Sequence, residues 1–131
     1  MKTTLLKKTI LLAVFCLSSA MGEDLVYSLG MLNGRGWVSA GHEGKLMYVR
    51  ALNDVFVTFK CDESTDFWPD NDKITIGEIA DVIDQFFADA ANRSVPILGA
   101  LSWAKQKMSG ADAAALESLA ATLRKGSAST K

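Results

Sequence analysis

Apolar residues recur at steps of three and four along most of the chain, which is the spacing that places them on one face of a helix. Four stretches show this spacing: about Ala40 to Lys60, a segment that follows Thr75, one from Pro96 to Gly110, and one from Ala111 to Arg124. The second is the best marked, because Thr75 and Glu78 form a capping box that starts a helix. The pattern therefore predicts an all-α domain of about four helices.

Two stretches do not fit the helical pattern. The run from Asn33 to Gly36 predicts a turn, since asparagine and glycine adopt positive φ at low cost. Before it lies a short apolar segment, Leu25 to Leu32, which fits either a short helix or an extended arm. After it, Ser39 is expected to be the N-cap of the first long helix. The second stretch, Cys61 to Lys73, predicts an acidic loop around two aromatic residues.

The beginning of the chain has the pattern of a secretory signal peptide. Lys2, Lys7 and Lys8 precede the apolar run from Ile10 to Leu17, which is too short to span a bilayer, and small residues follow it. The small residues fit cleavage before Met21 or before Glu23, and Glu23 is preferred. We therefore expect residues 1–22 to be removed, 23–125 to form one helical domain, and 126–131 to be a polar C-terminal tail.

Cleavage changes both the charge and the cysteine content. The whole chain has 14 basic and 15 acidic residues, and the loss of three lysines leaves a net charge of about −4. An acidic chain without a basic cluster argues against nucleic acid as a partner. Cys16 is removed with the signal and follows Phe15, where a lipoprotein needs a small residue, so no membrane anchor is expected. Cys61 is then alone, which excludes an intramolecular disulfide and favours a partly buried structural cysteine.

The acidic loop raises the possibility of a calcium site. Counted as an EF-hand from Asp62, the loop places Phe67 where that motif needs glycine and Lys73 where it needs a bidentate glutamate. We therefore predict solvated loop charge and no metal. The aromatic pair fits either a lid on the helices or a surface for a partner, and this alternative stays open. The residues assigned to such a partner surface are Trp37, Asp66, Phe67, Trp68, Asp70 and Asp72.

Few residues could support catalysis. The single histidine, His42, would lie about 28 Å from Cys61 along one continuous helix, which excludes an intramolecular dyad. The carboxylates of Glu78, Asp81 and Asp84 could act as acid and base on a glycan, but a polar helix face explains them more simply. No catalytic site and no cofactor are predicted.

A set of residues spread along the chain resembles a group of small exported bacterial proteins of unknown function. The set is Asn33-Gly34, Trp37, Lys45, Tyr48, Asn53-Asp54, Asp84-x-Phe86-Phe87-Ala88-Asp89, Asn92 and the run Val95-Pro96-Ile97. The helical layout is also similar to the Rap/Tai-type periplasmic immunity proteins, which protect bacteria from type VI secretion effectors that attack peptidoglycan. We expect Trp37 and Tyr48 to pack on the helices, and Asp84 or Asp89 to pair with a cation from Lys45 or Arg93. Asn92 is expected at the end of a helix.

Three functions from different classes follow. The first is an exported, periplasmic or secreted, non-catalytic protein that acts by protein–protein interaction, in the manner of an immunity protein or inhibitor. The second is a cell-envelope enzyme that acts on glycan through its helix carboxylates. The third is a carrier of calcium or a small ligand that uses the acidic loop. The first is preferred, because the other two lack a motif.

Overall fold

The computed structural model describes residues 26–28, 30–59 and 73–128. Within these residues the order is β1 (Tyr27–Ser28), β2 (Met31–Leu32), α2 (Gly34–Ser39), α3 (His42–Phe59), α4 (Ile76–Ala88), the short 3₁₀ helix η1 (Ala90–Asn92), α5 (Ile97–Met108) and α6 (Ala113–Ala128). The prediction of an all-α fold is confirmed. The predicted signal peptide and most of the acidic loop lie outside the described residues.

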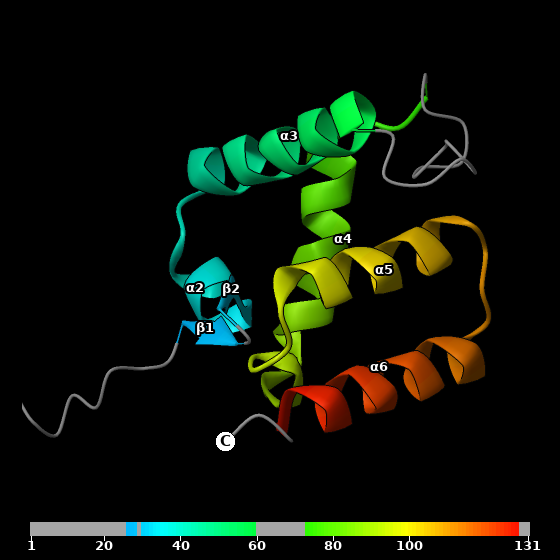
Figure 1. Cartoon of the computed structure of the whole chain (residues 1–131). Helices are drawn as coiled ribbons and strands as arrows, with labels where there is room; N and C mark the ends of the chain where they lie inside the picture. Colours follow the sequence, from blue (N-terminus) through cyan, green and yellow to red (C-terminus); the bar gives the residue numbers. More distant parts are fainter. Residues whose placement is uncertain (1–25, 29, 60–72, 129–131) are drawn as a thin grey trace, which may run out of the picture.

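Helix α4 is the central element (Figure 1). It packs against α2, α3, α5 and η1, while α6 packs against α5 and η1. Thr75 caps α4, and the capping box with Glu78 is present as predicted. The buried face of α4 holds Ile79, Ala80, Ile83, Phe86 and Phe87. Burying this many large apolar side chains makes α4 the main source of hydrophobic stabilisation among the described elements.

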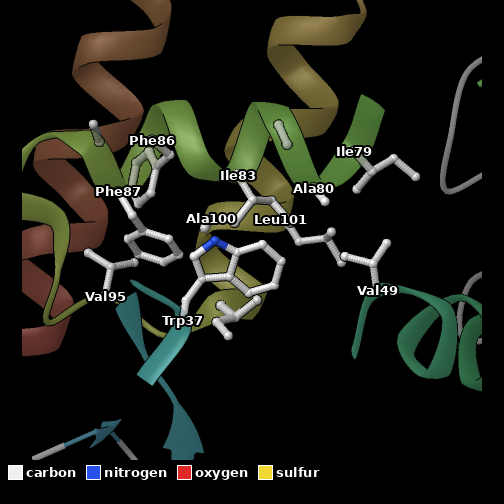
Figure 2. Packing of buried hydrophobic residues seen from close by; sticks show 13 residues of the cluster. Trp37, Val49, Ile79, Ala80, Ile83, Phe86, Phe87, Val95, Ala100 and Leu101 are labelled. Carbon is white, nitrogen blue, oxygen red and sulfur yellow. The ribbon is translucent and has the colours of Figure 1, made fainter. Parts of the chain in front are cut away.

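The core joins α4 to the N-terminal segment as well as to α5. Figure 2 shows Trp37 of α2 and Val49 of α3 on the same side of α4 as Ala100 and Leu101 of α5. Trp37 is only 1% exposed. The core therefore depends on a tryptophan from a helix that the sequence pattern did not predict.

The predicted turn at Asn33 to Gly36 was wrong, because this segment begins helix α2. Asn33 is its N-cap, and its side chain accepts from the backbone N–H of Arg35. Gly34 is needed for close packing: a Cβ there would lie 2.3 Å from Cδ1 of Phe87. The glycine reflects this close approach of α2 to α4, not the positive φ that we predicted.

Other element ends also differ from the predictions. Ser39 ends α2 and is not the N-cap of the following helix, and its hydroxyl donates to the Arg35 carbonyl within α2. For the segment before Asn33 we predicted either a short helix or an extended arm, and the structure shows it extended. It forms an antiparallel hairpin whose register pairs Tyr27 with Leu32. Helix α6 continues to Ala128, so the first residues of the predicted polar tail are helical.

Candidate functional site

Asp84 lies where three helices meet. The Nε1–H of Trp37 from α2 and the Nζ of Lys45 from α3 both donate to Asp84 Oδ1 on α4, each at 2.7 Å. The ammonium of Lys45 also lies 5.6 Å from the centroid of the Trp37 ring, within range of a cation–π interaction. We call Trp37, Lys45 and Asp84 the Asp84 junction. Of the pairings that the sequence left open, the one between Asp84 and Lys45 is present.

Tyr48 extends this junction along α3. Its ring packs edge-on against Trp37, with centroids 6.4 Å apart and planes at 82°. Burial, together with the nearby phenol of Tyr27, raises the pKa of Tyr48 above its usual value of 10.0. The contact with the buried Trp37 ring confirms the prediction that Trp37 and Tyr48 pack on the helices.

A second group of the motif residues joins the N-terminal segment to the loop before α5. Asn33 forms an isolated bridge with Pro96, Gly34 N–H donates to the Val95 carbonyl at 3.2 Å, and Arg35 N–H donates to the Arg93 carbonyl at 3.1 Å. Asn33 is 1% exposed, and its Nδ2 donates to Ser28 Oγ at 3.0 Å. These residues therefore hold two distant parts of the chain together, and their backbone groups do most of the bonding.

Asn92 forms a third polar centre, at the end of α4. Its Nδ2 donates to the Phe86 carbonyl at 2.7 Å, and its Oδ1 accepts from Nη1 of Arg124 on α6 at 2.9 Å. Arg124 also pairs with Glu117, and its Nη1 lies 3.8 Å from Asp89 Oδ2. We call Phe86, Asn92 and Arg124 the Asn92 junction. Asn92 ends η1 directly after α4, close to where the sequence placed it.

The ionic partner of Asp89 differs from the predicted one. Its carboxylate faces Arg124, not Arg93 or Lys45. The other carboxylate oxygen accepts from the Ala91 N–H at 2.9 Å and caps η1. Arg124 was missed because it lies far away in sequence on a helix whose rotation about its axis could not be predicted.

The carboxylates considered for glycan chemistry are used in different ways. Glu78 accepts from the Thr75 N–H at 2.7 Å and from the Thr75 hydroxyl at 2.8 Å, and the backbone bond is the larger cause of a lowered pKa for Glu78. Asp84 is held by Trp37 and Lys45, while Asp81 is exposed. Glu78 and Asp84 thus have local structural roles that account for their positions.

The predicted partner surface is only partly visible. Trp37 belongs to the core, so its assignment to that surface was wrong: folding buries its ring between α2, α3 and α4. Asp66, Phe67, Trp68, Asp70 and Asp72 lie outside the described residues. The surface residues that the sequence missed are exposed apolar side chains of β1, α2 and α3: Tyr27, Val38, Met47 and Val55. Their exposure could not be predicted from residue type, because β-branched and long apolar residues are also common in cores.

A further candidate site in the described part of the chain is an open depression of about 610 Å³ at the C-terminal end of α5. It is lined by Ser102, Lys105, Gln106, Ser109, Gly110 and Ala111. It contains none of the predicted site residues.

Among residues 26–28, 30–59 and 73–128, no group of three or more His, Cys, Asp or Glu could hold a metal ion. Within the same residues, no helix has the length and apolar character needed to cross a membrane.

Comparisons with protein-family models, curated proteins and solved structures found no match for this chain.

Proposed function

We propose that this protein is exported and acts outside the cytoplasm as a non-catalytic protein that binds another protein. Exposed apolar side chains on the N-terminal elements are the observation that carries the proposal. Tyr27 on β1 is 58% exposed, and Val38 on α2 is 45% exposed although its neighbour Trp37 is buried. Exposed side chains of this kind offer apolar area that a binding partner can cover.

The polar residues support the same proposal. The Asp84 and Asn92 junctions use their polar groups to hold helices together, and the Thr75 capping box uses its polar groups at the start of α4. Side chains locked in such contacts are suited to a rigid scaffold, which binds with little loss of conformational entropy. The resemblance to immunity proteins makes an envelope-directed toxin the first class of partner to test.

The test uses the full chain expressed with its own N-terminus. A photo-crosslinking amino acid is placed at Tyr27 or Val38, with Ser118 on the exposed face of α6 as the matched control. We expect a discrete adduct with a different protein from the first two positions and none from Ser118. Mass spectrometry of the periplasmic product also reports whether its N-terminus is Met21 or Glu23.

The adduct is then tested as a binding partner. The crosslinked protein is purified, and its saturable binding is measured by calorimetry against the unmodified chain, Val38→Glu and Ser118→Glu. Binding that is weakened by Val38→Glu alone supports the proposal. Absence of a saturable partner, or a protein that stays in the cytoplasm with residues 1–22 attached, overturns it.

A further inference from the structure

Helix α3 presents an apolar stripe on the side away from the core. Its buried side packs on α4 through residues such as Leu46 and Val49. On the opposite side Met47 is 65% exposed, Val55 is 47% exposed, and Ala51 between them is also exposed. Steps of four residues place these three side chains in one line along the helix. Figure 1 shows α3 at the edge of the structure, packed across one end of α4.

We propose that this stripe binds the same stripe of a second copy, so that two α3 helices pack antiparallel about a two-fold axis at Ala51. Met47 and Val55 are equally far from Ala51 in sequence, so the two-fold axis places Met47 of one copy against Val55 of the other. Ala51 meets its own counterpart, and its small side chain allows the helices to approach closely. An interface of this kind is isologous, since both copies use the same residues.

The charged residues beside the stripe complement themselves under the same symmetry. Arg50 and Asp54 lie on one flank of the stripe, about 40° apart around the helix at 3.6 residues per turn. The two-fold axis brings Arg50 of one copy to within about 3 Å along the helix direction of Asp54 of the other. Two equivalent Arg50–Asp54 pairs would therefore form across the interface. Both side chains are exposed, and within the described residues neither makes an ion pair or hydrogen bond.

The arrangement specifies a weak dimer. One pair of helices of this length buries less surface than the roughly 1,200–2,000 Å² of a stable complex. The dimer should therefore form and dissociate with protein concentration. This inference goes beyond the proposed function, because it needs no other protein and leaves Tyr27 and Val38, which lie outside α3, for a different partner.

A disulfide at the axis tests the geometry. In the mature chain carrying Cys61→Ser, the variant Ala51→Cys places two thiols next to each other across the two-fold axis. We expect it to form a covalent dimer under mild oxidation, and Ser118→Cys on the exposed face of α6 to remain monomeric under the same conditions. Equal dimer yields from both variants would mean random collision and would overturn the inference.

Sedimentation equilibrium of the mature chain tests the contacts. Ala51→Glu should raise the dimer dissociation constant about tenfold or more, since it places two like charges at the axis. Arg50→Glu and Asp54→Arg should each raise it about threefold, and the double variant should restore the wild-type value. Ser118→Glu should change nothing.

The outcomes separate this inference from the proposed function. A chain that stays monomeric at all concentrations, or a dimer that is insensitive to Ala51→Glu, overturns the inference while leaving crosslinking from Val38 unaffected. Circular dichroism of each variant shows whether the fold is retained, and Arg50, Ala51, Asp54 and Ser118 are exposed in the described structure. If the crosslinking experiment fails, the proposed function is overturned, but a dimer measured by sedimentation still supports the inference about α3.

Discussion

The Asp84 and Asn92 junctions both join helices through a polar side chain, but the two side chains differ in charge and burial. Each uses a polar side chain from α4, or from the residues just after it, to bind a helix distant in sequence. Asp84 is charged, its side chain is 44% exposed, and it receives its donors from α2 and α3. Asn92 is neutral, only 5% exposed, and bonds to both α4 and α6.

This difference determines where the stabilisation comes from. A half-exposed ion pair contributes little, because water screens the charges and also solvates them when the pair opens. A buried amide with both ends bonded contributes more, because its loss leaves buried groups without partners. At the Asp84 junction, therefore, we expect the packing of Trp37 to dominate. At the Asn92 junction we expect the hydrogen bonds themselves to dominate.

Truncating Trp37 should have the largest effect. Trp37→Ala removes a fully buried ring from the contact between α2, α3 and α4, and should lower the free energy of unfolding by about 3–5 kcal/mol. Trp37→Phe keeps an aromatic ring but loses the N–H that donates to Asp84, and should lower it by about 1–2 kcal/mol. Urea unfolding followed by far-UV circular dichroism measures both. Equal losses for the two variants would show that the hydrogen bond, and not packing, dominates this junction.

Removing the Asn92 amide should have the next largest effect. Asn92→Ala takes the donor from the Phe86 carbonyl and the acceptor from Arg124, and should lower the free energy of unfolding by about 2–3 kcal/mol. The control is Glu117→Ala, since the Glu117 side chain is exposed and pairs with the same guanidinium. A loss for Asn92→Ala no larger than for this control would contradict the assignment of a buried hydrogen-bonded centre.

The sequence predicted the long helices because each buries one face against a neighbour, so its apolar residues repeat with the helical period. The capping box at Thr75 was visible for a similar reason, since all its groups lie within one turn. Helix α2 was missed because it is short and contains two glycines, a composition that is typical of turns. Gly34 is required by a contact with Phe87, and no local pattern contains that information.

The polar centres could be predicted only where few partners were possible. The pair of Lys45 and Asp84 was one of the combinations left open, and it forms because adjacent helices α3 and α4 bring these two charges together. Arg124 was not among the candidate partners of Asp89, because it comes from α6, which reaches Asp89 only after α5 has turned the chain back. The same limit applies to the α3 stripe, since exposure of Met47 and Val55 depends on how α3 rotates onto α4.

The substitution with the smallest expected effect removes only the charge of Lys45. Among the residues that the structure describes, two lysines lie over tryptophan rings: Lys45 is 5.6 Å from the Trp37 centroid and Lys107 is 5.0 Å from the Trp103 centroid. Lys45 donates to the carboxylate of Asp84, whereas Lys107 donates to the neutral amide of Gln85. The two sites thus share a cation–π contact and differ in the charge of the acceptor.

Lys45→Met and its matched control Lys107→Met therefore differ by one ion pair. Each should lower the free energy of unfolding by less than about 1 kcal/mol, and the loss for Lys45 should be larger at low salt. Because salt screens the pair with Asp84 but not a bond to an amide, the difference between the variants should shrink at 1 M NaCl. A difference that persists at high salt would show that Lys45 acts through the packing of its alkyl chain against Trp37, as amphipathic side chains can. The ion pair between Lys45 and Asp84 would then have no measurable part in joining α3 to α4.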